Sequence, residues 1–336
     1  MRQRDVYFDN AKLLLIILVV LGHAIEPLTG DPFLKAVYAF IYSFHMPLFI
    51  FISGYFSKNT SHEAYATKII SKLVIPYLIF ETLYRLLDFF VTQKESIQLS
   101  YLTPYWIMWF LLSLILWKVA LPYIIKVRYA LPITLILGIL AGYSGEFGYY
   151  ASLSRTAVFF PFFLGGYYFE KEWLSKFFHL KYRLIGAGIL ISVLLTYIFL
   201  WDNIPLQWFY GSTRYAAMGH PEWYAGIYRA GLYVLSTFLG LAVLLLVPHK
   251  QVPYISEMGK NTMYPYLIHG LIRIAIYNVG LYSIINTAPE KILLVIGSVA
   301  LTLLLSLNRI RVCLKWLIEP ELNFLFRKKP VPVDPK

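Results

Sequence analysis

The chain has 336 residues, of which 59% are hydrophobic and only 14% are charged, and its mean hydropathy is +0.62. Soluble domains are about half apolar and a quarter charged, so this composition excludes an ordinary soluble domain and indicates an all-α polytopic membrane protein. The net charge of +12 is read as a signal of membrane topology and not of nucleic-acid binding.

Ten apolar segments are expected to cross the bilayer as helices. An even number of spans places both termini on one side, and most Lys and Arg residues fall on that side if it is cytoplasmic. We therefore predict a multi-pass protein of the cell membrane, with a membrane-embedded domain over residues 1–310 and a basic, partly disordered cytoplasmic tail over 311–336. The expected spans are 8–28, 36–57, 73–92, 105–123, 129–143, 155–170, 184–201, 229–247, 262–282 and 291–307.

The first span carries Asp9 and Lys12 near one end and His23 near the other. Ionisable groups within a spanning helix are costly, so each of them is a candidate functional residue. Lys12 and His23 are 11 positions apart, about three helical turns, and therefore lie near one face of the helix. Interfacial anchoring of Asp9 and Lys12, with a hydrogen-bonded interior histidine, is the alternative.

Two further spans contain a histidine close to a proline. His45 precedes Pro47 by two residues, and a proline kink at that point would open a cavity beside the imidazole. His269 follows Pro265 by four residues. All three histidines are expected to approach the middle of the membrane or its outer half. A simple packing role for each histidine is the alternative.

Charged residues also fall on or near the third, sixth and eighth spans. Arg155 and Arg229 begin the sixth and eighth spans from the outer side. Glu81, Arg85 and Asp88 have spacings of three and four residues, which allow ion pairs within one helix.

A metal site is not expected. Cys313 is the only cysteine, and no pair of histidines has the His-x-x-x-His spacing of a zinc site.

The longest outer connection, residues 201–228, is rich in Trp and Tyr. Aromatic residues gather at membrane interfaces, which is one explanation of this composition. The other is a carbohydrate-binding surface, in which aromatic faces stack on sugar rings while polar side chains bond the hydroxyls. Trp208, Arg214 and Trp223 are the candidates for substrate binding in this segment.

Several short motifs, taken in order, resemble the acyltransferase 3 family of integral membrane proteins, near its fucose-acetylase-like branch. The resemblance rests on Phe8-Asp9-Asn10-Ala11-Lys12 with Gly22-His23, on Phe44-His45-Met46-Pro47, on Phe160-Pro161-Phe162-Phe163-Leu164-Gly165-Gly166, and on Gly259-Lys260-Asn261-Thr262 with His269-Gly270. It implies O-acyl transfer, usually of acetyl, from cytoplasmic acyl-CoA to a hydroxyl of an extracytoplasmic glycan or lipid-linked sugar. No permanently bound cofactor is implied.

The family's essential first-helix histidine corresponds to His23, which we expect to act as a general base. Glu26, His45 or His269 would orient His23; alternatively, either of these two histidines would stabilise the oxyanion together with Arg155. Lys12, Lys68, Lys72 and Lys260 are candidates to bind the phosphates of the CoA donor, although many members carry arginine at the positions of the first three. A transporter or flippase for a polysaccharide or lipid-linked sugar is the alternative function, because proline-broken helices and buried charges also occur in transporters.

Overall fold

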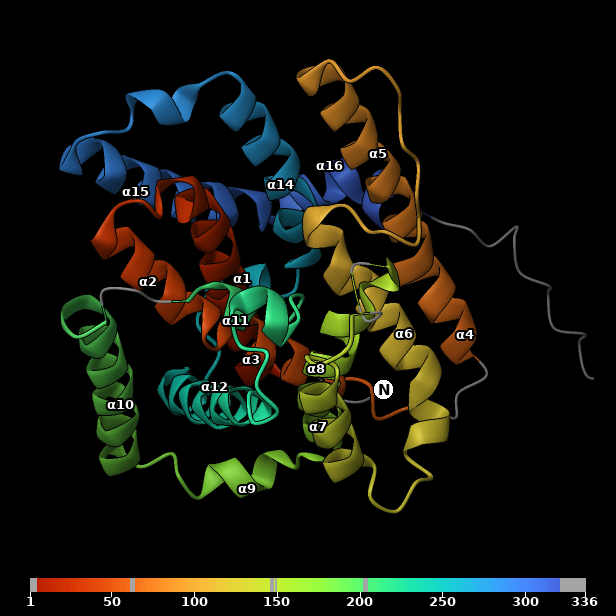
Figure 1. Cartoon of the computed structure of the whole chain (residues 1–336), viewed down its shortest axis with the longest axis vertical. Helices are drawn as coiled ribbons and strands as arrows, with labels where there is room; N and C mark the ends of the chain where they lie inside the picture. The colour runs from red at the N-terminus through yellow and green to blue at the C-terminus, as the bar shows by residue number, and fades with distance from the viewer. Residues whose placement is uncertain (1–4, 61–63, 146–147, 149, 202–204, 321–336) are drawn as a thin grey trace, which may run out of the picture.

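The computed structural model describes residues 5–60, 64–145, 148, 150–201 and 205–320. Within these ranges every regular element is helical, as the composition predicts (Figure 1). The helices are α1 (Val6–Ile25), α2 (Pro32–Tyr42), α3 (His45–Tyr55), α4 (Ala64–Ile69), α5 (Ile75–Thr92), α6 (Trp109–Ile124), α7 (Ala130–Leu140), α8 (Leu153–Tyr168), α9 (Lys171–Ser175), α10 (Leu180–Phe199), α11 (Gln207–Tyr210), α12 (Gly226–Leu246), α13 (Ile255–Met258), α14 (Met263–Asn278), α15 (Ala288–Leu305) and α16 (Asn308–Ile318).

All ten predicted spans coincide with helices, but only some of these helices have the length and composition of a membrane span. In the described part of the chain, six helical stretches are long and apolar enough to cross a membrane: Val6–Leu28, Pro32–Tyr55, Trp106–Ile124, Leu180–Phe199, Gly226–Leu246 and Ala288–Leu305. Helix α7 is apolar but has only 11 residues, and α8 and α14 have 16 each. The number of spans and the side of the termini therefore stay predictions. Helix α16 occupies the start of the expected tail, and residues 321–336 lie outside the described residues.

The second span is broken, and the break lies before the position expected from Pro47. Helix α2 ends at Tyr42 and α3 begins at His45. Pro47 thus falls in the first turn of α3, where a residue without an N–H leaves no helical hydrogen bond unmade. The expectation of a kink at Pro47 is corrected to a break at Ser43 and Phe44, which places Tyr42 and His45 at the two helix ends that meet there.

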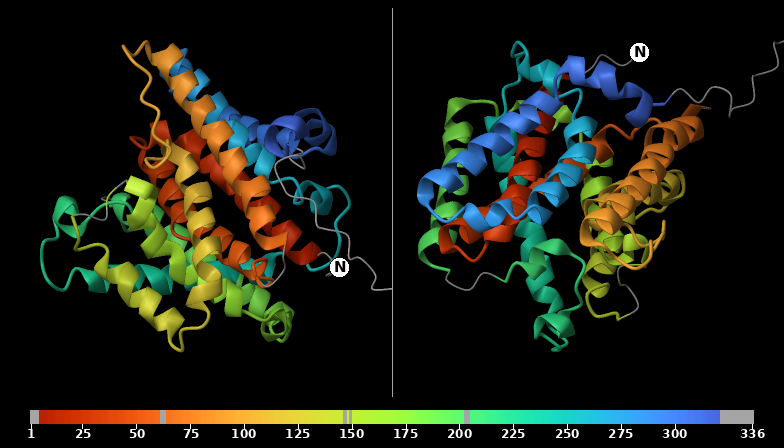
Figure 2. Two further views of the ribbon diagram at one scale, coloured as in Figure 1. Left: turned by 90° about the vertical axis from the view of Figure 1, so that its right-hand side faces the viewer. Right: turned by 90° about the horizontal axis from the view of Figure 1, so that it is seen from above.

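Helix α1 is the central element of the bundle. It packs against α2, α3, α13, α14 and α15, and the rotated views in Figure 2 show it enclosed by them. Its first half is tied down by polar contacts: the Asn10 amide donates to the carbonyl oxygens of Pro248 and Lys250 at 2.8 and 3.1 Å. Buried Asp9 pairs with Lys12 at 2.8 Å. The Asn10 contacts fix the position of α1 along its own axis relative to its neighbours, and hence the position of the residues at its other end.

The closest helix crossing brings α3 against α8. A Cβ added to Gly54 would lie 1.9 Å from the carbonyl oxygen of Phe163, and one added to Gly166 would lie 1.8 Å from that of Phe51. Small residues allow backbones to touch in this way, and such contacts are a main source of helix association where no water is present to drive it. Gly166, the second residue of the Gly165-Gly166 pair noted in the sequence, thus has a packing role.

Helices α2 and α15 begin side by side, next to the end of α1. Asp31 caps α2 by accepting a hydrogen bond from the Leu34 N–H at 3.0 Å, and it also accepts one from Lys291 at 2.6 Å. The Lys291 ammonium and the Leu34 N–H hold the pKa of the Asp31 carboxyl below its usual value. Helix α15 begins with a capping box of Thr287 and Glu290. This region forms one rim of the site described next.

Candidate active site

His23 lies in the last turn of α1 and is held from two directions. Its Nδ1 atom is 3.1 Å from the hydroxyl oxygen of Tyr42, which comes from the broken end of α2. The same Nδ1 is 3.5 Å from Oε2 of Glu26, in the 3-10 turn Glu26–Leu28 that follows α1. Residues three apart share a helix face, so the end of α1 itself brings the carboxylate to the imidazole.

Glu26 is held in turn by Arg273 of α14, whose Nη2 is 3.3 Å from Glu26 Oε2. The guanidinium of Arg273 also lies 4.6 Å from the centre of the Trp106 ring, which is itself 4.6 Å from the His23 ring. Arginine, carboxylate and imidazole therefore form a row of three. When Nδ1–H of His23 donates to Glu26, Nε2 carries the lone pair, which is the arrangement of an oriented general base.

The structure brings His269 next to His23 and fixes which of its nitrogens can accept a proton. The two rings stack with their centres 5.5 Å apart. Nδ1 of His269 lies 2.7 Å from the carbonyl oxygen of Pro265. A carbonyl oxygen can only accept a hydrogen bond, so Nδ1 carries the hydrogen and Nε2 is the acceptor. Nε2 is buried and has no hydrogen-bond partner among the described residues.

His45 repeats this arrangement. Its Nδ1 is 2.8 Å from the carbonyl oxygen of Ile41 in the last turn of α2. Its Nε2 is therefore also an acceptor while the ring is neutral. The sequence suggested both His45 and His269 as stabilisers of an oxyanion, but a neutral imidazole with this tautomer offers the oxyanion no hydrogen from Nε2.

A cavity of about 240 Å³, here called the aromatic pocket, unites His23 with the other polar candidates. Its lining includes His23, Tyr42, His45, Trp106, Arg155 and Tyr210. Arg155 donates from Nε to the carbonyl oxygen of Tyr210 at 3.2 Å, and its guanidinium lies 5.1 Å from the centre of the Trp109 ring. A permanent positive charge thus enters the same cavity as the two histidines.

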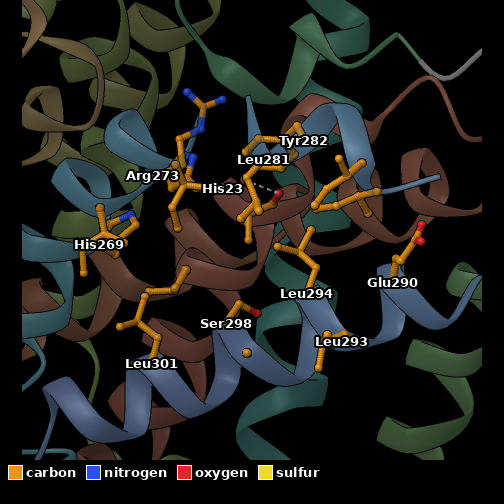
Figure 3. Close-up of a pocket in the computed structure, with 17 residues that line it drawn as sticks. His23, His269, Arg273, Leu281, Tyr282, Glu290, Leu293, Leu294, Ser298 and Leu301 are labelled. Atoms are coloured by element: carbon orange, nitrogen blue, oxygen red, sulfur yellow. Dashed lines mark hydrogen bonds between the residues drawn. The ribbon is translucent and has the colours of Figure 1, made fainter. Parts of the chain in front are cut away.

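A second cavity of about 470 Å³, here called the apolar pocket, lies on the other side of His23, between α1, α14 and α15. Figure 3 shows His23, His269 and Arg273 along one wall and Leu294, Ser298 and Leu301 of α15 along the opposite wall. His23 lines both cavities, so its imidazole is the point where they meet.

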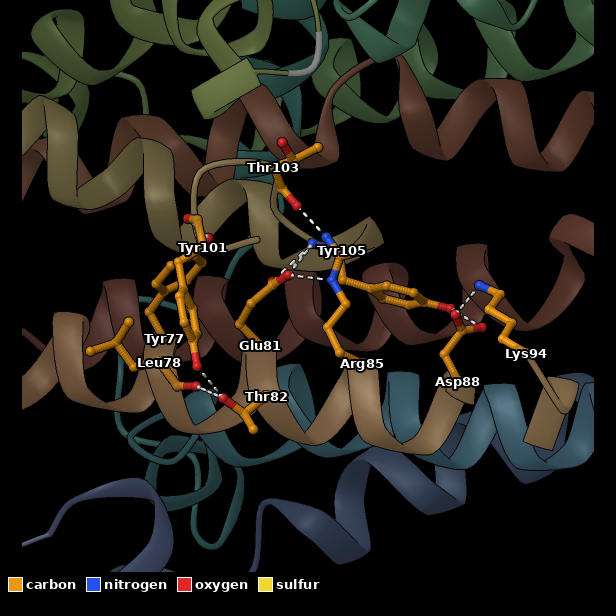
Figure 4. A network of polar contacts seen from close by, with 10 residues as sticks. All are labelled: Tyr77, Leu78, Glu81, Thr82, Arg85, Asp88, Lys94, Tyr101, Thr103 and Tyr105. Carbon is orange, nitrogen blue, oxygen red and sulfur yellow. Dashed lines mark hydrogen bonds and ion pairs between the residues drawn. The ribbon is translucent and has the colours of Figure 1, made fainter. Parts of the chain in front are cut away.

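Trp106 covers His23 and Arg273. The residue before it, Tyr105, is bound by an ion pair on α5 whose carboxylate is buried (Figure 4). The Glu81 carboxylate is fully buried and accepts from Nε of Arg85 at 2.9 Å, as the spacing predicts. The same carboxylate accepts from the backbone N–H of Tyr105 at 3.0 and 2.9 Å. Trp106 follows with a positive φ of 36°, an unfavourable backbone conformation that such fixed neighbours can maintain.

Asp88 does not join the pair of Glu81 and Arg85, although its spacing allowed it. It accepts from the Tyr105 hydroxyl at 3.0 Å and pairs with Lys94. The connection between α5 and α6 is therefore attached to α5 near its start, at Lys94, and at Tyr105, the residue directly before Trp106.

The four lysines proposed for CoA binding line neither of the two cavities at His23. Lys12 pairs with Asp9, Lys260 pairs with Glu257, and Lys72 lies 4.0 Å from Glu319. Lys68 is exposed. Lys12 is 11 residues before His23, roughly 16 Å along the helix, so it lies toward the opposite end of α1. Lys260 follows Gly259, which packs against Asp9 at that same end.

The outer aromatic candidates are also separate from His23. Trp208 is 5% exposed and stacks on Tyr215 with ring centres 5.3 Å apart, and its carbonyl oxygen accepts a hydrogen bond from Nη1 of buried Arg229 at 2.8 Å. Its ring is thus covered by protein. Trp223 is 86% exposed and Arg214 is exposed as well, but neither lines the aromatic pocket.

Three residues of the site were not identified from the sequence: Tyr42, Trp106 and Arg273. Arg273 is one turn after His269 on α14, a spacing that places both on one face. No comparable signal marks Tyr42 or Trp106, because their contacts with His23 depend on the break after α2 and on the attached connection before α6.

Comparison with known proteins gives a match over nearly the whole chain and two partial matches. A family model described as an acyltransferase domain, of the acyltransferase 3 type, matches residues 5–307. The nodulation protein NolL of Sinorhizobium fredii is 48% identical over 61 residues, 17% of each chain, and that of Mesorhizobium japonicum is 47% identical over 60 residues, 17% of this chain and 16% of the relative. The matched part is therefore about a sixth of these relatives. No solved structure matches the chain.

Proposed function

The chain belongs to the acyltransferase 3 family, and from this premise we propose that it moves an acyl group, acetyl by default, from a cytoplasmic acyl-CoA to a hydroxyl of an extracytoplasmic glycan or lipid-linked sugar. One observation carries the proposal: the row of Arg273, Glu26 and His23, which ends at an imidazole lining two cavities. Two cavities at one imidazole suit a reaction with two substrates.

His23 is the proposed general base. Nε2 takes the proton of the acceptor hydroxyl while the hydroxyl oxygen attacks the thioester carbon. The C–O bond forms, the C–S bond breaks, and the imidazolium then gives its proton to the departing CoA thiolate. Glu26, 3.5 Å from Nδ1, stabilises the imidazolium and keeps the ring in the required tautomer.

Arg155 is the proposed partner of the oxyanion. It lines the same cavity as His23 and stays positively charged at all relevant pH values. His45 and His269 have Nδ1 bound to backbone carbonyls, so as neutral rings they would accept hydrogen bonds from substrate hydroxyls. Their proposed role is therefore to orient the acceptor.

The donor is proposed to enter from the end of α1 that carries Lys12. Lys12, Lys68, Lys72 and Lys260 would attract the CoA phosphates as point charges, and the flexible arm of CoA would reach the thioester toward His23. With that end cytoplasmic, the exposed Arg214 and Trp223 would lie on the acceptor side of the cell membrane. CoA is a substrate in this scheme, and no bound cofactor is required.

The test is acetyl transfer from radiolabelled acetyl-CoA into membranes that contain the protein. His23→Ala should reduce incorporation by a factor of 100 or more, because a general base contributes about 10²–10⁴ to the rate. The matched control is His220→Ala, since His220 also has a glutamate near its Nδ1, at 3.6 Å, but lines neither cavity. Equal incorporation by His23→Ala and the control would refute the role of His23, and no incorporation with wild type would refute acetyl-CoA as donor.

A further inference from the structure

We propose that the apolar pocket binds the hydrocarbon chain of a membrane-anchored acceptor, so that the acceptor is an amphiphile and not a free polysaccharide. The inference rests on the proposed function, because it names the class of acceptor for that site. The lining of the pocket, its opening and one buried polar atom without a partner among the described residues support it.

The lining of the pocket suits a hydrocarbon chain. Apart from the polar groups of His23, His269 and Arg273 on one wall, it consists mainly of aliphatic side chains such as Ile272 and Leu294. The walls include α1 and α15, both long and apolar enough to lie at the depth of lipid chains. Along the aliphatic part of this lining water would find no hydrogen-bond partner, whereas a hydrocarbon chain there restores the dispersion contacts that an empty cavity lacks.

The opening of the pocket faces outward across α15 and the turn before it. Leu293 and Ile284, which line it, are 69% and 62% exposed. In a membrane, exposed aliphatic side chains at a helix of this type face lipid. A chain can therefore enter sideways from the bilayer, without leaving the hydrocarbon region.

The unpartnered atom is Nε2 of His269. Its residue is 2% exposed, the atom has no hydrogen-bond partner among the described residues, and the side chain lines the pocket on the same wall as His23. Because Nδ1 donates to the Pro265 carbonyl, Nε2 needs a donor such as a hydroxyl. A molecule that places a hydroxyl at this wall and a chain in the pocket meets both requirements.

The hydrocarbon chain in the pocket is assigned to the acceptor and not to the acyl-CoA donor, because the pocket and the proposed donor entry lie toward opposite ends of α1. The pocket uses the second half of α1, from Val20 to Ala24, and extends along α15 toward Glu290 near its beginning. Of the lysines proposed for CoA, Lys12 lies toward the other end of α1, and Lys260 follows Gly259, which packs against Asp9 there. A long donor acyl group is the competing occupant, and the experiments below distinguish it.

The first experiment needs no enzymatic activity. The full-length protein is reconstituted in vesicles of phosphatidylcholine and phosphatidylglycerol with a small fraction of phosphatidylcholine whose palmitoyl chain carries a diazirine. After irradiation, we expect label on Ile272 and Leu301 inside the pocket. Gly297→Phe should reduce this label at least fivefold, because a Cβ at Gly297 meets no atom within 4 Å and the larger ring would project into open space.

The matched control is Ile296→Phe, one residue away on α15 at a position that is 59% exposed and does not line the pocket. It should keep the label at Ile272 and Leu301. Label confined to outward-facing positions such as Ile292 in the wild type would overturn the inference.

The second experiment identifies the occupant through acetyl transfer in membranes of the cells that make the protein. We expect label from acetyl-CoA in the lipid-extractable fraction, at least tenfold less with Gly297→Phe, and unchanged with Ile296→Phe. Label only in water-soluble glycan, or equal rates for both variants, would overturn the inference while leaving the proposed function intact. A Gly297→Phe defect restricted to palmitoyl-CoA would assign the pocket to the donor and also overturn it. No transfer at all would refute the proposed function, and the photolabelling would still decide whether a chain enters the pocket.

Discussion

Replacing Glu26 by glutamine tests the row of charges at His23 most directly. The substitution keeps the shape of the side chain and its oxygen for Arg273 but removes the negative charge. At the 3.5 Å separation of Nδ1 and Oε2, and with an effective dielectric constant of about 20, the attraction between imidazolium and carboxylate is about 5 kcal/mol. Glu26 is 31% exposed and shares its charge with Arg273, so water and the guanidinium reduce this value.

We take roughly 3–4 kcal/mol as the surviving stabilisation, which corresponds to about a 100- to 1,000-fold fall in kcat. The KM for acetyl-CoA should change little, because Glu26 acts on the imidazolium that forms during the reaction. The assay is the initial rate of acetyl transfer in vesicles with purified protein, at several concentrations of acetyl-CoA. Glu26→Asp, which keeps the charge on a shorter side chain, should recover part of the loss.

The chain contains a matched control for this experiment. Glu222 lies 3.6 Å from Nδ1 of His220 and is similarly exposed, but it lines neither cavity. Glu222→Gln should therefore retain the wild-type kcat. If Glu26→Gln also stays within threefold of the wild type while both variants are folded, the carboxylate does not assist His23 and the mechanism proposed here is wrong.

Three further predictions concern the surroundings of the site. Tyr42→Phe removes a hydroxyl 3.1 Å from Nδ1 of His23 and should lower kcat about 3- to 10-fold, the effect of one hydrogen bond of about 1 kcal/mol; an unchanged kcat would contradict a role in holding the ring. Glu81→Ala leaves a partly buried arginine and the Tyr105 N–H without their carboxylate and should reduce stability by about 1–3 kcal/mol, measured as a fall in the thermal unfolding temperature; an unchanged temperature would contradict the positioning of Trp106 by this pair. Gly54→Ala should prevent folding, seen as aggregation in size-exclusion chromatography, whereas Gly188→Ala, whose Cβ meets no atom within 4 Å, should fold normally.

The helices could be predicted from the sequence, because apolar runs of this length have few alternatives in a membrane. Their lengths were less predictable. The second span reads as one continuous segment, yet the helix breaks at Ser43 and Phe44, since Pro47 is better accommodated in a first turn than in a helix interior. The break is a tertiary feature, and it brings Tyr42 to His23.

The histidines could be identified as a group, because ionisable residues within spans are rare. Their roles could not, because a role depends on which nitrogen is bound by the surroundings. The Pro265 carbonyl fixes the tautomer of His269, and this follows only from a measured distance of 2.7 Å. The pairing of Glu81 with Arg85 was predictable from spacing alone, whereas the pairing of Glu26 with Arg273 joins residues 247 positions apart and depends on the packing of α1 against α14.

The end of α1 is well suited to a base that must change charge. The last carbonyl groups of a helix carry a partial negative charge, which favours a cation there. His23 lies in that last turn, and the chain continues into a 3-10 turn that carries Glu26 over the same face. An imidazolium formed at His23 is thus stabilised by two sources on its own helix, while Arg273 limits the negative charge of Glu26 when the ring is neutral. Since the two cavities also meet at this ring, the proposed transfer and the proposed meeting of the substrates would depend on the same few residues at one helix end.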